Sequence, residues 1–457
     1  MNDDPTKFAS ARRHRRGTVL IVTMFITIAL AAVVVVFARQ SSVSAIASAN
    51  RAAQAQASFI ARGAFQYVMA QLSANPGRHL SEQDLPAEAL ELGGGYFWLV
   101  RAEPDGGDGL GLGITDESSK LNLNVATPDM LIKLPRMTDE LAFSIVDWRD
   151  SDSEPEPAGA ESPYYLSLDD AYYAKDRPFE TIEELQLVRG SDQELIFGED
   201  ANRNHVLDPN ENDRDATAPS DNSDSVLDRG LLEYLTVYSA EPNTDTEGEP
   251  RVNLNDSNTQ ELAEQLERSL GAKPAQVILA RIIVNRPFRN LMDLYFRVGL
   301  TESQLDALAD GVTTSDLPRL PGQINVNTAP QEVLAALPEL TEDDAAKLVA
   351  TRAGNDASEG GIGWIAETLS QQKAVMIGDY ISGRSFQFTM DVVAVSPRGR
   401  AFKRYRAVLD TSDAFPRIVH FEDITALGWP LETKLLQRIR SGTFTEGRKP
   451  PVLTATL

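Results

Sequence analysis

The chain opens with a run of apolar residues long enough to cross a membrane. Residues 17–38 contain no charged side chain, and the run is bounded by Arg16 and Arg39. A helix rises ~1.5 Å per residue, so about 20 apolar residues span the ~30 Å hydrocarbon layer of a bilayer. The cationic residues 12–16 favour a cytoplasmic N-terminus. The pattern predicts a single-pass transmembrane helix over residues 18–38, with the bulk of the chain on the far side.

The same helix is predicted to continue beyond the membrane, over residues 39–75. This stretch is rich in Ala and Gln and contains no Pro. Apolar side chains recur at roughly i, i+4 spacing, at Phe59, Ala64, Val68 and Leu72. Because such a stripe occupies one helix face, we expect this half to be amphipathic.

A first group of strands is predicted just after the long helix. Residues 76–94 are turn-rich and lead into an aromatic and β-branched run at 95–100. A second strand is expected at 110–115, beyond a Gly- and Asp-rich turn. We assign residues 76–120 to the first part of a sheet.

The rest of this sheet is predicted near the C-terminus. Residues 385–396 and 401–410 alternate between apolar and polar positions, and a turn at 397–400 joins them. They predict a β-hairpin over 385–410 and complete an antiparallel sheet that is interrupted by a long helical insertion. The predicted fold class is therefore α+β. Residues 411–457 carry no clear signal and are expected to form an extension.

Internal repeats fill the insertion. An Asn-x-Asn motif within a short apolar segment occurs at 121–124, 252–255 and 324–327. At a constant offset of 203, residues 130–149 align with 333–352. Both copies place Leu-Pro at the same point, a Thr at a helix N-cap position and an Arg at the end of the second helix. The repeat predicts helical hairpins.

The middle copy shares a further signature with the first. Residues 177–190 resemble 286–299, and both segments begin with Arg-Pro-Phe. We therefore divide the insertion into a first helical domain at 121–240 and a second helical repeat region at 250–384.

An alternative function follows from these hairpins, because they resemble the helix-hairpin-helix units of DNA-binding and DNA-uptake proteins. Such units bind phosphate through Gly-rich turns. The turns at 135–138 and 338–341 lack Gly, and the second carries Glu339. The net charge of −24 also opposes binding to a phosphate backbone. We expect no nucleic acid partner, and a membrane-anchored DNA-binding protein is the alternative.

Composition also disfavours an enzyme. The chain has no Cys and only four His, which are far apart in the sequence. No nucleophile, His base or Gly-rich phosphate loop accompanies its acidic pairs. We predict that the protein is not an enzyme.

One segment of the acidic stretch 192–228 has the spacing of a calcium loop. It follows the EF-hand pattern at loop positions 1, 3, 5, 7, 9 and 12, occupied by Asp200, Asn202, Asn204, Val206 (through its main-chain carbonyl), Asp208 and Glu211. His205 replaces the usual Gly at position 6, where φ is positive, and His tolerates that conformation better than most residues. We predict a structural Ca²⁺ site with a dissociation constant on the order of 10⁻⁴–10⁻³ M. The alternative is a solvated, flexible loop.

The N-terminus resembles the leader of type IV pilins and pseudopilins. Gly17 stands directly between the Arg cluster and the apolar run. The resemblance implies that residues 1–17 are a leader, that a prepilin peptidase cleaves after Gly17, and that Thr18 is the first mature residue. Val22 then occupies the fifth mature position, where most pilins carry Glu. A plain, uncleaved signal anchor is the alternative.

An ordered set of further segments resembles the general secretion pathway protein K family, the large minor pseudopilins of the type II secretion system. The segments are 116–124, 150–155, 159–165, 177–190, 230–239 and 324–329. The resemblance implies a pilin-like fold with a large inserted helical domain, and calcium sites are known in the family. It also implies a bacterial inner-membrane protein with a periplasmic bulk. The implied partners are prepilin peptidase, other minor pseudopilins and the major pseudopilin.

The family also implies a position at the tip of a periplasmic pseudopilus, where the protein would help to start or cap assembly. In pilins, the Glu at the fifth position is thought to neutralise the N-terminal amine of a neighbouring subunit. A buried carboxylate in lipid needs such a partner, so Val22 suits a subunit with none above it. The extra repeat at 250–310, the acidic loop and the tail depart from the family pattern.

Overall fold

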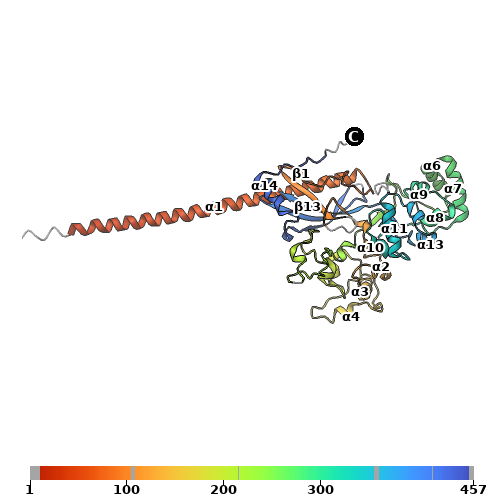
Figure 1. The fold of residues 1–457 in the computed structure, drawn as a ribbon, viewed down its shortest axis with the longest axis horizontal. Helices are drawn as coiled ribbons and strands as arrows, with labels where there is room; N and C mark the ends of the chain where they lie inside the picture. The colour runs from red at the N-terminus through yellow and green to blue at the C-terminus, as the bar shows by residue number, and fades with distance from the viewer. Residues whose placement is uncertain (1–10, 104–108, 215, 355–359, 414, 452–457) are drawn as a thin grey trace, which may run out of the picture.

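The computed structural model describes residues 11–103, 109–214, 216–354, 360–413 and 415–451, with the backbone alone for 11–16. A single helix, α1 (Ala11–Ser73), begins the described chain. It is the one helix among the described residues that is long and apolar enough to cross a membrane, with a mean hydropathy of 3.1 in its best window. Residues 1–10 of the expected leader lie outside the described part. Figure 1 shows the N-terminal half of α1 projecting free of the folded domain.

An antiparallel sheet lies beside the C-terminal half of α1, which confirms the α+β fold class. The strand order is β1-β2-β13-β14-β15, and all pairs are antiparallel. The strands are β1 (Leu90–Leu92), β2 (Gly95–Ala102), β13 (Gln387–Val395), β14 (Phe402–Asp410) and β15 (Arg417–Asp423). The hairpin predicted at 385–410 is formed by β13 and β14.

The second strand predicted in this region is split in two. Gly113 has a φ of +123° and interrupts the segment. β3 (Leu110–Leu112) pairs with β2, whereas β4 (Thr115–Asp116) pairs with β13. The chain therefore crosses from one strand to the next at this Gly.

Helix α1 covers one face of the sheet with small and apolar side chains. Ala64, Val68 and Leu72 are buried there against strand residues such as Phe97 and Val392. Phe59 is 66% exposed, so its predicted place in the apolar stripe is wrong. It lies five positions before Ala64, which rotates it by about 140° away from the buried face.

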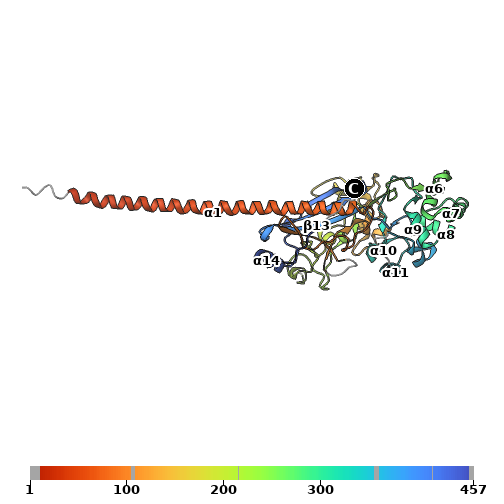
Figure 2. The same cartoon turned by 90° about the horizontal axis from the view of Figure 1, so that it is seen from above.

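The opposite face of the sheet is covered by the C-terminal segment, which we expected to be an extension without a clear signal. β15 adds an edge strand, and α14 (Thr433–Ser441) places Ile439 against Trp98 and Val393 of the sheet. Because successive residues of β2 point to opposite faces, Trp98 meets this tail while Phe97 meets α1. Figures 1 and 2 show α1 and α14 at the sheet.

The insertion contains three modules, and in each of them the first and last strands pair with each other. In each, the strand of the Asn-x-Asn motif pairs in parallel with a strand that ends the module. The pairs are β5 (Leu121–Asn122) with β6 (Leu235–Thr236), β8 (Val252–Asn253) with β9 (Val312–Thr313), and β11 (Ile324–Asn325) with β12 (Ile381–Ser382). We call 121–236 the first module, 252–313 the middle module and 324–382 the third module.

Short helices build each module around the strand pair. The first contains α2 (Pro128–Leu131), α3 (Asp139–Arg149), α4 (Ser162–Tyr165) and α5 (Gln193–Phe197). The middle contains α6 (Thr259–Leu270), α7 (Ala272–Asn285), α8 (Leu291–Val298) and α9 (Glu302–Ala309). The third contains α10 (Gln331–Ala336), α11 (Glu342–Arg352), α12 (Trp364–Thr368) and α13 (Gln371–Ile377).

One apolar core runs through all three modules, from Leu121 to Ile381. The second helical repeat region that we predicted therefore contains two modules, and it shares its core with the first helical domain. The remaining short strands, β7 (Ala240–Pro242) and β10 (Arg319–Pro321), pair where the chain enters and leaves the middle module. Figure 1 places the middle module at the end of the molecule opposite the free half of α1.

The repeated polar residues explain why the modules look alike. Arg149 donates to the main-chain carbonyls of Leu123 and Ala126, and Arg352 donates to those of Val326 and Ala329. The second Asn of each motif binds the main chain of a later segment in its module: Asn124 that of Phe179, Asn255 that of Phe288 and Asn327 that of Gly361. The repeat thus conserves contacts that close each module.

Candidate functional site

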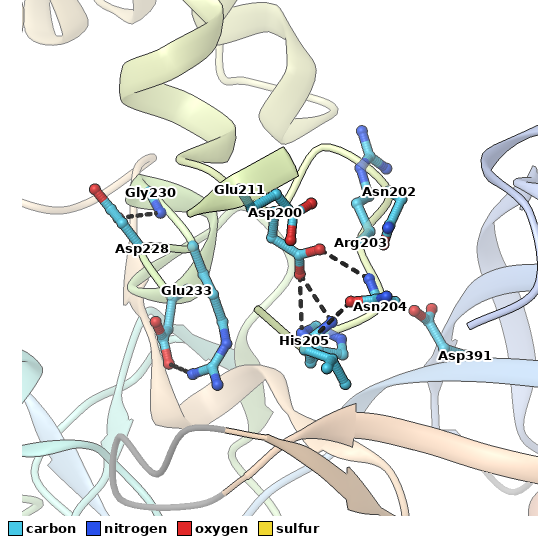
Figure 3. Close-up of polar contacts among 12 residues, drawn as sticks. Asp200, Asn202, Arg203, Asn204, His205, Glu211, Asp228, Gly230, Glu233 and Asp391 are labelled. Atoms are coloured by element: carbon cyan, nitrogen blue, oxygen red, sulfur yellow. Dashed lines mark hydrogen bonds and ion pairs between the residues drawn. The ribbon is translucent and has the colours of Figure 1, made fainter. Parts of the chain in front are cut away.

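The predicted calcium loop follows α5 and folds around the carboxylate of Asp200. That carboxylate accepts hydrogen bonds from the main-chain N–H of Asn204 (2.8 Å) and of His205 (3.0 Å). The side-chain oxygen of Asn204 accepts from the N–H of Val206 (2.7 Å). These bonds bend the loop around the Asp200 carboxylate, as Figure 3 shows.

The second half of the loop returns to the first through Asp208. Its Oδ2 accepts from the amide groups of Asn202 (2.7 Å) and Asn204 (2.9 Å). The N–H of Asp208 donates to Oε2 of Glu211 (3.0 Å), in a short helical turn that begins at Pro209. The five side chains of the predicted ligand set therefore lie on one hydrogen-bonded loop, while Val206 is 37% exposed and offers only its main chain. The carboxylates of Asp200, Asp208 and Glu211 are not among the described carboxylates that gather within 4.8 Å of one another.

His205 occupies the position where calcium loops usually carry Gly. Its φ is +62°, the left-handed conformation that this position requires. Its side chain is largely buried, with Nδ1 3.5 Å from a carboxylate oxygen of Asp200, and burial lowers the pKa of His205 to about 3. The ring is therefore neutral at physiological pH and adds no positive charge to the loop.

Two carboxylates of the loop, those of Glu211 and Asp200, are held in an environment that disfavours their charge. Burial raises the pKa of Glu211 to about 7, and the neighbouring Asp200 and Asp208 contribute in the same direction. Burial also raises the pKa of Asp200, against the opposing effect of its two N–H donors. A bound cation would relieve this repulsion.

Two oxygen atoms of the loop are buried without a hydrogen-bond partner. They are Oε1 of Glu211 and Oδ1 of Asn202, at loop positions 12 and 3. An unsatisfied buried oxygen costs free energy unless it has a partner. Ca²⁺ takes six to eight hard oxygen ligands, so the donors in this loop fit the ion that the spacing predicts.

A second acidic cluster lies in the same module and was not predicted from the sequence. Asp150, Asp152 and Glu161 offer carboxylate oxygens that all lie within 4.8 Å of one another. Burial raises the pKa of Glu161 to about 7, and the Asp147 carboxylate adds to this effect. Oε1 of Glu161 and Oδ1 of Asp150 are buried without a partner. The Asp and Glu residues alternating over 150–154 were a weak signal, and Glu161 joins them only through the fold.

The predicted processing residues lie on the free part of α1. Gly17 and Thr18 are exposed, and Val22 is 51% exposed. An added Cβ at Gly17 would meet no atom within 4 Å. The assignments of Gly17 and Thr18 to cleavage, and of Val22 to a tip-specific position, stay predictions.

Two segments of the chain match known family models. Residues 120–197 and 324–371 match models that are both described as type II secretion system (T2SS), protein K. They are the opening parts of the first and third modules, the two copies related by the offset of 203. The chain is a protein K-like minor pseudopilin.

A solved structure is similar to the pseudopilin over most of its length. It is the GspK-GspI-GspJ complex from the type 2 secretion system of enterotoxigenic Escherichia coli. The identity is 12% and the TM-score is 0.39, over 80% of this chain and 95% of that chain. No curated protein sequence matches the pseudopilin. The protein K family is a structural pseudopilin family, and the absence of enzymatic activity stays a prediction.

Proposed function

We propose that this minor pseudopilin sits at the tip of a periplasmic pseudopilus and helps to start or cap its assembly. The observation that carries the proposal is the position of the three modules. The middle and third modules lie beyond the end of α1, on the side opposite its free half, and the first module lies beside the sheet (Figures 1 and 2). A pilus is a stack of subunits that pack along such helices. The modules would therefore leave no room for another subunit beyond the C-terminal end of α1.

Partners and topology follow from this role. The free half of α1 would lie in the inner membrane with its N-terminus in the cytoplasm, and the sheet and modules would lie in the periplasm. Prepilin peptidase would cut after Gly17. The exposed helix would then pack against other minor pseudopilins and the major pseudopilin.

Nucleic acid binding has little physical support in the hairpins. The first turn of α3 carries Asp139 and Glu140, and the first turn of α11 carries three acidic residues. Helix N-termini attract anions, and here that attraction already serves the protein's own carboxylates. A phosphate would meet negative charge at both hairpins.

The N-terminus of the mature protein provides the first test. We expect intact mass and peptide sequencing of the native, membrane-extracted protein to give a chain that starts at N-methylated Thr18. A chain that keeps residues 1–17 would identify an uncleaved signal anchor and contradict the assembly role.

Gold labelling of isolated pseudopili tests the tip position. We expect label at one end of each fibre and no label along its length. The Val22→Glu variant should reach positions within the fibre if the missing carboxylate confines the protein to the tip, and Val22→Ile serves as the matched control. Label along the fibre in the wild type would contradict the proposal.

We further propose that the loop from Asp200 to Glu211 binds a structural Ca²⁺, with Asp150, Asp152 and Glu161 as a second site. The bound ion would neutralise mutually repelling carboxylates and order their loops. Calorimetric titration of the full-length protein in detergent should find two sites in the wild type and one in Asp200→Asn/Glu211→Gln. Asp213→Asn, at a half-buried acid two residues after the loop, is the control and should keep both sites. A wild type that binds no calcium would contradict the proposal.

A further inference from the structure

The calcium loop of the first module contacts a buried arginine of the pilin-like sheet. Arg404 lies on β14 and is 0% exposed. One guanidinium nitrogen donates to the main-chain carbonyl of Asn202 at 2.7 Å, and the other terminal nitrogen donates to the carbonyl of Arg203. Two regions far apart in sequence are therefore joined by a buried, charge-assisted pair of hydrogen bonds.

The charge of Arg404 has no carboxylate of its own on the sheet. Asp391 is 3.8 Å away, but both of its oxygens bind Arg406 at 2.8 Å. Two guanidinium groups thus share one carboxylate. A buried charge needs hydrogen-bond partners, and the loop carbonyls supply them to Arg404.

The loop has a second contact with the sheet next to the first. Arg203 forms an ion pair with Glu422 of β15 at 3.2 Å, and its guanidinium also stacks over the ring of Phe197. Figure 3 shows Asp391 beside the loop at the same interface. Positions 3 and 4 of the loop are therefore anchored to two adjacent strands.

Apolar packing at this interface is incomplete. A cleft of about 320 Å³ lies between the first module and the sheet, and His205, Asp391 and Arg406 are among its lining residues. Another polar link nearby is Glu117, which accepts hydrogen bonds from Thr236 and from Thr389 of β13. Polar contacts therefore carry much of the attachment, and the loop supplies a large share of them.

We propose that Arg404 is a positioning residue for the calcium loop, and that calcium bound there fixes the first module on the pilin-like sheet. This inference rests on the proposed calcium site. Asn202 offers its side chain to the ion and its carbonyl to Arg404, so the two contacts act on opposite sides of one residue. By linkage, whatever orders the loop strengthens its bonds to Arg404, and those bonds strengthen calcium binding by the same factor.

The test compares calcium binding and hydrogen exchange in variants of the full-length protein in detergent. Arg404→Met keeps the length of the side chain and removes its donors. We expect it to weaken calcium binding to the loop by at least tenfold, the scale of losing charged hydrogen bonds. Lys403→Met, on the same strand and paired with Asp423 instead of the loop, should leave the affinity unchanged. The Asp150→Asn/Glu161→Gln background isolates the loop site.

Hydrogen exchange supplies the readout that calcium affinity alone does not. In the wild type, calcium should slow exchange both in the loop and in β14 and β15, whereas in Arg404→Met it should slow exchange in the loop only. Should Arg404→Met fail to fold, Glu422→Gln breaks the neighbouring anchor and should weaken binding by about twofold, the scale of an exposed ion pair.

The possible outcomes separate this inference from the proposed calcium site. The coupling would be overturned if Arg404→Met bound calcium with wild-type affinity and calcium still slowed exchange in its β14 and β15. Glu422→Gln provides the same test if Arg404→Met does not fold. Either result would leave the calcium site standing. A wild type that binds no calcium would overturn both.

Discussion

The first and third modules are two copies of one scaffold. They differ in the segment that runs from the end of the second helix to the closing strand, which we call the return path. Both open with an Asn-x-Asn strand, both place a Thr at the N-cap of their second helix, and both end that helix in an Arg that binds two carbonyls. After that Arg, the third module returns through two short helices, α12 and α13. The first module returns through a long, largely irregular path that contains both acidic clusters.

The difference lies in what is buried along the two paths. In the third module, Trp364, Ile365 and Ile377 are buried apolar residues. In the first module, the return path buries acids as well, including Glu161, Glu199, Asp200, Glu211 and Asp221. A segment held by apolar contacts needs no ligand, whereas a segment that buries carboxylates needs cations or hydrogen-bond donors to compensate their charge. The shared scaffold therefore holds one copy whose closing segment is apolar and one whose closing segment buries the carboxylates of the proposed calcium sites.

The largest expected effects come from the core that the two copies share. Leu131 and Leu334 occupy equivalent positions, and both are 0% exposed. Leu131→Ala and Leu334→Ala should each lower the free energy of unfolding by about 2–5 kcal/mol, because both leave a cavity in the same core. Denaturant unfolding in calcium should give one transition for each variant. Two separate transitions would show that the modules are independent units.

Removal of calcium should destabilise the first module and leave the third module unaffected. If the free calcium is about 100 times the dissociation constant, chelation should cost about 2.7 kcal/mol for each site that it empties. We expect faster hydrogen exchange at residues 199–214 and no change in α10 and α11 of the third module. Asp200→Asn/Glu211→Gln should reproduce the loss at 199–214 without chelation. Equal loss of protection in both modules would contradict the comparison.

The second Asn of each motif should show a smaller effect. Asn124 exchanges two hydrogen bonds with the main chain of Phe179, at 2.7 and 3.0 Å, and Asn255 makes the same pair with Phe288. Asn124→Ala and Asn255→Ala should each cost about 1–3 kcal/mol, because buried main-chain groups lose their partners.

The third copy gives this prediction an optical signature. Asn327 accepts a hydrogen bond from the indole N–H of Trp364 at 3.1 Å. Asn327→Ala should therefore change the fluorescence of the protein, and Asn124→Ala should leave that of Trp364 unchanged. An identical spectral change in both variants would show that the modules are not separately organised at these positions.

The sequence predicted those parts of the structure that rest on local patterns. The apolar run gave α1, alternation gave the β13–β14 hairpin, and the repeated Asn and Arg residues marked the modules. β15 was missed because Ile418, Val419 and Phe421 remain substantially exposed on an edge strand, so the segment lacks the alternation of a half-buried strand.

The candidate site was predictable only within one continuous loop. Its spacing predicted a common site for residues 200–211. Glu161, however, joins Asp150 across a turn, and Arg404 binds Asn202 from a strand that follows the insertion in the sequence. Contacts of that kind depend on topology, and no periodicity in the chain encodes them. They are also the contacts that connect the site to the rest of the molecule.

The smallest expected difference concerns the start of the second helix in each hairpin. In the third module, the carboxylate of Asp344 accepts hydrogen bonds from the N–H and hydroxyl of Thr341 and from Lys373, and these donors lower its pKa to about 2. The equivalent position in the first module is Leu141, which donates only its N–H to the Thr138 cap. At this helix start, the third module carries a capping carboxylate and the first module does not.

The sign of its pH dependence follows from the lowered pKa. Because the folded-state pKa lies below the ordinary value of 3.8, the stabilising contribution of Asp344 is complete above about pH 4 and is lost as the pH falls toward 2. Asp344→Asn should remove about 1 kcal/mol at neutral pH, the scale of a helix cap, and less at pH 2. Thr138→Ala should cost a similar amount at both pH values, since its bond involves no ionised group. Equal costs of Asp344→Asn at pH 7 and pH 2, measured by denaturant unfolding, would show that the carboxylate contributes no charge-dependent stability and that the two caps differ in sequence only.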